Sequence, residues 1–143
     1  MARDESYVLD ICDRVLKSKS LRQHRFDELR GDPGRNGTKR RLPVDAYYPE
    51  LAMVIEYRER QHTEAVAIMD RRMTISGCTR AEQRRHYDAR RRKVIPILGL
   101  SLIEIDFYLL HHDSRGRLLR LSQEDEEAIR RILGFHTPRF PTS

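Results

Sequence analysis

The chain has 143 residues and a formal net charge of +6 at pH 7, and its length suggests one domain built around one core. Hydrophobic residues make up 38% and charged residues 35% of the chain, and the apolar residues recur in periodic runs, which favours a folded protein over a disordered one. No apolar stretch is long enough to span a bilayer, so we expect no contact with a membrane. The basic excess favours an anionic partner, most commonly nucleic acid, and a basic surface without such a partner is the alternative.

Cysteine content and the first residues predict where the protein resides. Cys12 and Cys78 form no C-x-x-C pair, and a disulfide framework is not expected. MARDESYVLD at the start has no apolar leader segment. We therefore expect a cytoplasmic protein, associated with the nucleoid if it is bacterial. A homodimer is compatible with the sequence.

The first part of the chain predicts one helix followed by irregular structure. Apolar residues recur on one face of residues 4–17, which predicts a helix. Residues 21–30 are expected to form a short helical or irregular piece. The segment GDPGRNGTKRR, residues 31–41, contains three glycines and a proline, so it is expected to be a flexible basic loop within a single domain that covers residues 1–143.

The next segment, LPVDAYYPELAMVIEYR, alternates with period two and predicts two strands, over residues 42–48 and 53–58. Pro49 suits a tight turn between them. A four-residue connection would place Tyr48 opposite Met53, and therefore Asp45 opposite Glu56, on one face of the hairpin.

The second half of the chain predicts a helix, a strand and a final helix. Residues 61–79 are expected to form a loop with a helical turn at 64–70. Thr79 and Glu82 have the capping-box spacing, which predicts a helix from there to residue 98. A strand over 100–110, a helix over 123–133 and a loose tail over 135–143 follow. Together these elements predict an α/β fold with a mixed central β-sheet flanked by helices and one crossover connection.

Two carboxylates facing each other at about 5 Å destabilise a hairpin unless something compensates their charge. One solution is a cationic side chain, and Arg58 lies on the same face as Glu56. The other is a divalent metal bound between Asp45 and Glu56, with His62 as a further candidate ligand. Oxygen ligands suit Mg²⁺, and an added histidine would tolerate Mn²⁺.

The residues VDAYYPELAMVIEYRERQH followed by HYDARRRKVIPILGLSLIEIDF resemble the PD-(D/E)XK, or restriction-endonuclease-like, nuclease superfamily. The resemblance is to its branch similar to the very-short-patch-repair endonuclease, and it extends over residues 42–107. In that branch a strand bearing Asp leads through a turn to I-E-x-x-x-x-Q-H. A helix with Y-D-x-x-R and a glycine-led strand follow. The resemblance implies a restriction-endonuclease-like core and Mg²⁺-dependent hydrolysis of phosphodiester bonds in DNA.

The resemblance also implies roles for particular residues. Asp45 would be the main metal ligand and Glu56 the second, while His62 would be a ligand or the general base. Glu5, on the first helix, would complete the metal site, with Glu28 as a weaker rival. Arg58 stands where the superfamily has lysine; because arginine does not lose its proton, it could only hold the phosphate or the attacking water.

The alternative is a catalytically degenerate nuclease fold that binds nucleic acid without cleaving it, and a third hypothesis is an interaction protein with no nucleic acid role.

Residues 71–93 contain nine basic and two acidic residues, a balance that favours contact with phosphate groups. The alternative is a solvated helix face with pairs such as Asp88 with Arg92. The predicted contacts to nucleic acid lie in the basic loop and along this helix: Lys39, Arg40, Arg41, Arg80, Arg84, Arg85, Arg91 and Arg92.

Overall fold

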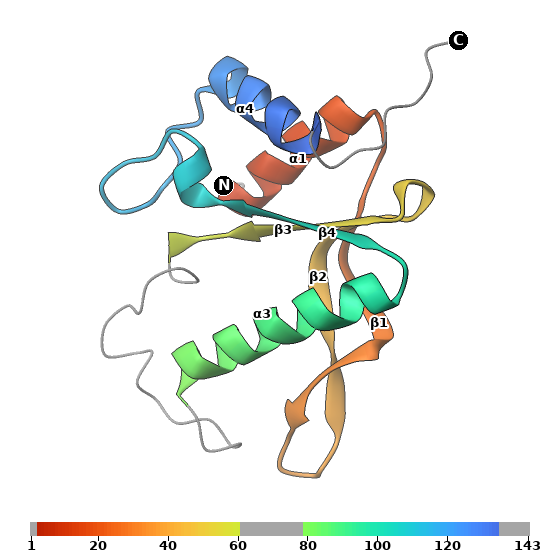
Figure 1. The fold of residues 1–143 in the computed structure, drawn as a ribbon. Helices are drawn as coiled ribbons and strands as arrows, with labels where there is room; N and C mark the ends of the chain where they lie inside the picture. Colours follow the sequence, from red (N-terminus) through yellow and green to blue (C-terminus); the bar gives the residue numbers. More distant parts are fainter. Residues whose placement is uncertain (1–2, 61–78, 135–143) are drawn as a thin grey trace.

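The computed structural model describes residues 3–60 and 79–134 (Figure 1). Its helices and strands, in chain order, are α1 (Asp4–Leu16), β1 (Leu21–Pro33), β2 (Lys39–Tyr48), β3 (Met53–Arg58), α3 (Arg80–Ile97), β4 (Ser101–Asp106) and α4 (Ser122–Gly134). Single 3-10 turns over Pro49–Leu51 and Phe107–Leu109 follow β2 and β4. Within this described part of the chain, no helix is both long and apolar enough to cross a membrane.

The four strands form one mixed sheet in the order β1-β2-β3-β4. β1, β2 and β3 pair antiparallel, whereas β3 and β4 pair parallel. A parallel pair needs a crossover connection, and α3 lies in that connection. Helices α1 and α4 cover one face of the sheet, while α3 lies on the other (Figure 1). The predicted α/β class, with a mixed sheet flanked by helices, is therefore confirmed.

Two buried apolar clusters hold these layers together. The larger lies between the sheet and helices α1 and α4, and includes Leu9, Tyr48, Ile55 and Ile129, each with no exposed surface. The smaller lies on the α3 side of the sheet and is formed by Leu29, Leu42, Val44, Val54 and Ile95. Because β3 contributes to both clusters, it is covered on both faces.

Several predicted elements agree closely with the structure. The first helix ends at Leu16, and Tyr48 pairs with Met53 across the turn as the period-two pattern predicts. Thr79 caps α3, since its hydroxyl accepts a hydrogen bond from the Glu82 N–H at 3.1 Å. The helical turn predicted over residues 64–70 and the tail over 135–143 lie outside the described residues.

Two predictions for residues 21–41 were wrong. The segment expected to be helical or irregular forms most of strand β1, and the expected loop forms the end of a β1–β2 hairpin. Only residues 34–38 lie between the two strands. The loop was predicted from the glycines, but in the structure these glycines have roles within the hairpin. Gly37 adopts a φ of +78° at the tip of the hairpin. Gly31 lies against Tyr87, where a side chain would collide.

β3 differs from the half-buried strand that the alternating pattern predicts. All six of its residues are buried, including the two charged ones, Glu56 and Arg58, which are each 7% exposed. The strand is central in the sheet and covered on both faces, so its polar positions are enclosed as well. Buried charges require partners, and the partners of these two define the candidate site.

Candidate functional site

The candidate site begins where the backbone ladder between β2 and β3 ends, at the pair Ala46 and Ile55. One position further along, the backbone N–H groups donate to side-chain carboxylates instead of to backbone carbonyl groups. The Asp45 N–H donates to Glu56 Oε2 at 2.8 Å, and the Tyr57 N–H donates to Asp45 Oδ2 at 2.8 Å. The register therefore places Asp45 and Glu56 side by side, as the sequence predicts. Each carboxylate accepts a hydrogen bond from the opposite strand, which fixes its orientation.

Glu5, on α1, lies beside this pair. The side-chain amide of Gln23 donates to Glu5 Oε2 at 3.1 Å and to Asp45 Oδ1 at 3.4 Å, so it joins the two carboxylates. Partial burial, followed by the nearby charge of Asp45, raises the pKa of Glu5 from 4.5 to about 7. The structure thus brings together the three acidic residues that the resemblance implies for a metal site.

Glu56 is the most enclosed of the three carboxylates. Burial, and next the charge of Asp45, raise its pKa well above the ordinary value, while Arg91 acts in the opposite direction. Arg91 Nε lies 2.9 Å from Glu56 Oε1. The same guanidinium donates to the Pro43 carbonyl oxygen at 3.0 Å. The cation beside the acidic pair is therefore Arg91.

Arg58 does not bridge Asp45 and Glu56, which corrects the first of the two expected solutions. Its terminal nitrogens instead pair with Asp88 Oδ2 at 2.8 Å and Glu104 Oε1 at 2.9 Å. The second oxygen of Asp88 lies 3.1 Å from Arg91, so one carboxylate on α3 holds both guanidinium groups. Arg58 is thereby turned toward α3 and β4, because carboxylates there satisfy its charge.

The three acids and their arginines line a cleft of about 260 Å³. Its walls come from α1, β2, β3 and α3, and Arg3, Glu59 and Tyr57 complete them. Carboxylate oxygens are the ligands that Mg²⁺ and Mn²⁺ prefer. Burial, and after it the charge of Asp45, raises the pKa values of Glu5 and Glu56, and a bound cation would stabilise both carboxylates in their charged form. The donor set therefore suits such a metal. Among residues 3–60 and 79–134, no group of three or more Asp, Glu, His or Cys side chains already stands in a geometry that would hold one.

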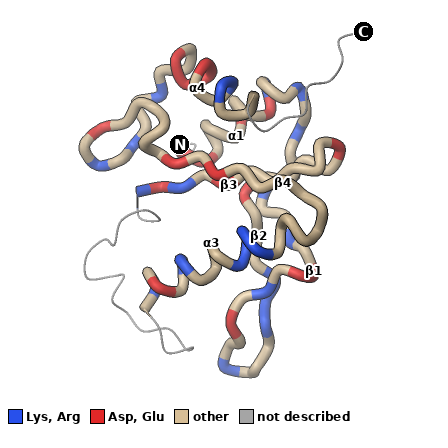
Figure 2. Tube along the Cα trace, in the orientation of Figure 1, with Lys and Arg blue, Asp and Glu red and all other residues tan. Residues whose placement is uncertain are grey.

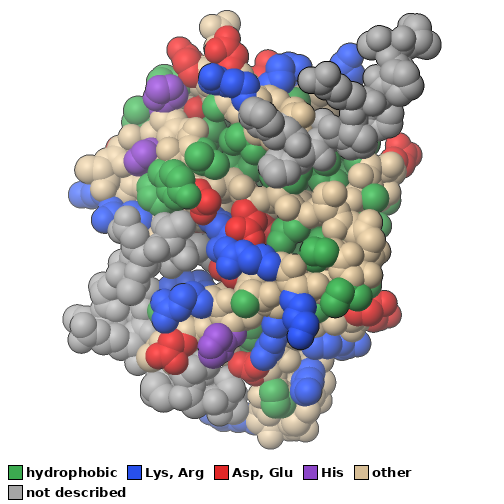
Figure 3. Space-filling model, viewed as in Figure 1, with side chains coloured by type: hydrophobic (Ala, Val, Ile, Leu, Met, Phe, Trp, Pro, Cys, Tyr) green, Lys and Arg blue, Asp and Glu red, His purple; other side chains and the backbone are tan. Residues whose placement is uncertain are grey.

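The residues predicted to contact nucleic acid separate into three groups. Lys39, Arg40 and Arg41 are exposed on the β1–β2 hairpin. Arg80, Arg85 and Arg92 are exposed on α3, although Arg92 is held by Glu104 at 2.7 Å. Arg84 and Arg91 are half-buried, and Arg91 faces the cleft. Lys and Arg residues are distributed along both α3 and the hairpin (Figure 2), and Lys and Arg side chains are exposed on this face of the molecule (Figure 3).

Sequence reasoning missed three contributors to the site. Gln23 was not singled out because its segment was not recognised as a strand. Asp88 was named only in the alternative of a solvated helix face, as a partner of Arg92, and Arg91 was expected to contact nucleic acid. The i,i+3 spacing of Asp88 and Arg91 on a helix was the signal for their pairing. Their orientation toward β3 could not be read from that spacing alone. His62, which was predicted to be a metal ligand or the general base, lies outside the described residues.

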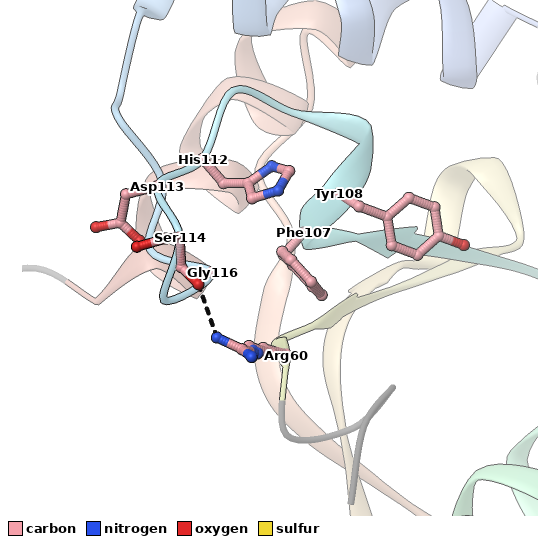
Figure 4. A pocket seen from close by; sticks show the side chains of 7 residues that line it. All are labelled: Arg60, Phe107, Tyr108, His112, Asp113, Ser114 and Gly116. Atoms are coloured by element: carbon pink, nitrogen blue, oxygen red, sulfur yellow. Dashed lines mark hydrogen bonds between the residues drawn. The ribbon is translucent and has the colours of Figure 1, made fainter. Parts of the chain in front are cut away.

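A second cavity, of about 450 Å³, lies beyond the end of β4 and contains none of the predicted site residues. Phe107 and His112 meet edge to face in it with ring centroids 5.0 Å apart, and Tyr108, which also lines it, is 56% exposed. The Arg60 guanidinium closes one side by donating to the Ser114 carbonyl oxygen at 2.8 Å (Figure 4). Asp113 is the one carboxylate among the described residues that line this cavity, whereas the cleft at Asp45 gathers several.

Comparison of the chain with protein-family models, with curated proteins and with solved structures finds no match.

Proposed function

We propose that this protein is a metal-dependent nuclease that hydrolyses phosphodiester bonds in DNA. The observation that carries the proposal is the placement of Asp45 and Glu56 side by side at the end of the β2–β3 ladder, in one cleft with Glu5 and the guanidinium of Arg91. Carboxylates held together at the cost of mutual repulsion are typical of a site that binds a cation. A guanidinium in the same cleft suits a phosphate group.

The order of elements supports the same proposal. The resemblance to the restriction-endonuclease-like superfamily implies a leading helix, a strand with Asp, a strand with Glu, an arginine-rich helix and a glycine-led strand. The chain has α1, β2, β3, α3 and β4 in that order, with Gly99 before the last strand. We therefore propose a restriction-endonuclease-like core, although β1 and the first residues of β2, up to Arg41, precede the region of resemblance.

The proposed roles follow from position in the cleft. Glu5, Asp45 and Glu56 would hold Mg²⁺ or Mn²⁺, which supplies a Lewis acid and lowers the pKa of water when bound. Arg91 would contact a non-bridging phosphate oxygen, a role in which its fixed charge stabilises the additional negative charge of the transition state. Arg58, held by Asp88 and Glu104, would position Arg91 through Asp88 rather than touch the water. His62 remains the proposed general base.

Plasmid nicking combined with calorimetric titration of Mg²⁺ and Mn²⁺ tests the proposal. Wild-type protein should bind metal and nick DNA only when metal is present. Asp45→Asn should lower nicking by at least about 100-fold, because an amide is a weaker ligand but can still accept the hydrogen bond from Tyr57. Glu50→Gln, on the exposed turn between β2 and β3, is the matched control and should behave as wild type. Undiminished nicking by Asp45→Asn would overturn the assignment.

A second candidate function is a nuclease-like fold that binds nucleic acid without cleaving it. The ion pair between Arg91 and Glu56 favours it, because a guanidinium already neutralises one proposed ligand. Binding of DNA with no metal uptake and no nicking in the wild-type protein would select this candidate. Metal uptake accompanied by nicking would exclude it.

A further inference from the structure

The β1–β2 hairpin extends beyond the body of the protein as a two-stranded arm. In Figure 1 its tip points away from the sheet and past α3. Every residue from Pro33 to Arg41 is exposed, and the first inward-facing side chain on β2 is Leu42, which is 8% exposed. The arm therefore leaves the body near Gly31 and Leu42. It buries little apolar surface of its own, so its extension is not explained by core formation.

Interactions at both ends hold the arm in one shape. At the tip, the Gly34 N–H donates to the Thr38 carbonyl oxygen at 3.0 Å, and the Gly37 N–H donates to the Gly34 carbonyl oxygen at 3.0 Å. At the base, the Asp32 N–H donates to Tyr87 Oη at 3.0 Å. Arg90 of α3 also pairs with the Asp32 carboxylate at 2.5 Å. A preorganised element of this kind binds a partner with little further loss of conformational entropy.

The arm carries cations that nothing in the described chain neutralises. The side chains of Arg35, Lys39 and Arg40 make no hydrogen bond or ion pair with any residue of 3–60 or 79–134. Several arginines nearer the cleft, in contrast, are held by carboxylates: Arg58 by Asp88 and Glu104, Arg91 by Glu56, and Arg92 by Glu104. Unpaired cations on an extended, solvent-facing element are the groups best able to exchange water and salt ions for phosphates.

We propose that the β1–β2 arm enters the major groove of duplex DNA. Two paired strands lie about 4.8 Å apart, and with side chains they fit a B-form major groove about 12 Å wide and about 8.5 Å deep. From Leu42 to Lys39 the arm extends about 10 Å at about 3.3 Å per residue, which is enough to cross that depth. The narrow major groove of duplex RNA does not admit such a ribbon.

This inference rests on the proposed function in one respect, namely that the partner is nucleic acid, and it adds the kind of nucleic acid. Lys39 and Asp45 lie on the same strand and are about 20 Å apart along it. A duplex held by the arm would therefore present its backbone to the Asp45 cleft within about one helical turn. The arm would set the position of the duplex, while the cleft would act on one strand.

The test measures binding in EDTA, so that cleavage plays no part. Fluorescence anisotropy measures the affinity for a 20-base-pair DNA duplex and for a duplex RNA of the same sequence. We expect the wild-type protein to bind the DNA duplex more tightly. In the variant Arg35→Ala/Lys39→Ala/Arg40→Ala, the slope of log affinity against log salt should fall by about 3, one for each phosphate that the variant no longer neutralises. The control Arg14→Ala/Arg130→Ala/Arg131→Ala removes the same charge from exposed positions on α1 and α4 and should leave the slope close to wild type.

Groove preference is read by methylation interference. Methylation at guanine N7, which lies in the major groove, should weaken binding of the wild-type protein within one helical turn. Equal affinity for duplex RNA, no interference at N7, or equal effects of the arm and control variants would each overturn the inference. Binding through the arm without nicking in Mg²⁺ would support the inference while removing the catalytic part of the proposed function. Absence of nucleic acid binding would overturn both.

Discussion

Arg91 Nε lies 2.9 Å from Glu56 Oε1, so one of the three proposed metal ligands already has a cation beside it. A metal ion at Glu56 would have to displace or share this guanidinium. We therefore expect Arg91→Gln to bind Mg²⁺ about tenfold more tightly, because removal of one partly buried positive charge lowers the electrostatic barrier to a second. Nicking should nevertheless fall, because the variant has no guanidinium to hold the phosphate.

Calorimetric titration of Mg²⁺ measures the first effect, and Arg92→Gln is its control, since Arg92 pairs with Glu104 rather than with Glu56. Weaker metal binding by Arg91→Gln would mean that the guanidinium supports the site instead of competing for it.

Stability of the metal-free protein should decrease as pH rises from about 4.5 to about 7. The pKa of Glu5 is raised from 4.5 to about 7, so in this interval the folded state retains a proton that the unfolded state has lost. Each increase in pH then favours the unfolded state. Glu56, whose pKa is also raised, contributes in the same direction.

Thermal unfolding in EDTA between pH 5 and pH 8 measures this trend. Glu5→Gln carries no titrating proton and should make the curve flatter, whereas Glu50→Gln, exposed on a turn, should leave it unchanged. A wild-type melting temperature that rises through the same interval, with no difference in Glu5→Gln, would contradict the raised pKa of Glu5.

Removal of Asp88 should destabilise the fold strongly. Its two oxygens pair with Arg58 and Arg91, and Arg58 is only 7% exposed. Asp88→Ala leaves a buried guanidinium with one carboxylate, Glu104, and we expect a decrease of about 3 kcal/mol in the free energy of unfolding. Urea denaturation measures it. Asp106→Ala, on β4, is the control, and a decrease below about 1 kcal/mol in Asp88→Ala would show that the pairing is not what holds α3 on the sheet.

Gly31 permits the close approach of the arm to α3. A Cβ atom there would lie 2.9 Å from Tyr87 Oη and 3.0 Å from Leu42 Cδ2, closer than such atoms approach. We expect Gly31→Ala to cost about 1–3 kcal/mol and to weaken the hydrogen bond from the Asp32 N–H to Tyr87. Faster hydrogen exchange at the Asp32 amide would report that change. Gly34→Ala is the matched control, because its Cβ would meet neighbours no closer than 3.7 Å.

The sequence predicted those parts of the fold that local pattern determines. The first helix, the register between Tyr48 and Met53 and the Thr79 cap depend on residues within a few positions of each other. β1 could not be recognised in the same way. Its Phe26 and Leu29 are spaced three apart, as on a helix, and its extended form depends on pairing with β2.

The sequence predicted only the part of the candidate site that lies within the β2–β3 hairpin. The length of the turn places Asp45 opposite Glu56, so this pair could be named from the sequence. The partner of each arginine could not be predicted, because it depends on how α3 is rotated against the sheet. Arg58 therefore pairs with Asp88 and Glu104, whereas the guanidinium beside Glu56 belongs to Arg91, which is remote in sequence.

Asp45 and Glu56 are close together in the sequence, whereas Arg91 is distant from both, and this difference has a consequence for the order in which they meet during folding. Asp45 and Glu56 are 11 residues apart, so their hairpin closes with little loss of loop entropy and brings two negative charges together at once. Arg91 comes with α3, after β3, and its docking offsets that repulsion. We expect contacts of high sequence separation to form after this local hairpin, because closing a longer loop costs more entropy, so the two carboxylates would repel each other until α3 docks. Formation of the parallel β3–β4 pair would then be coupled to neutralisation of the cleft.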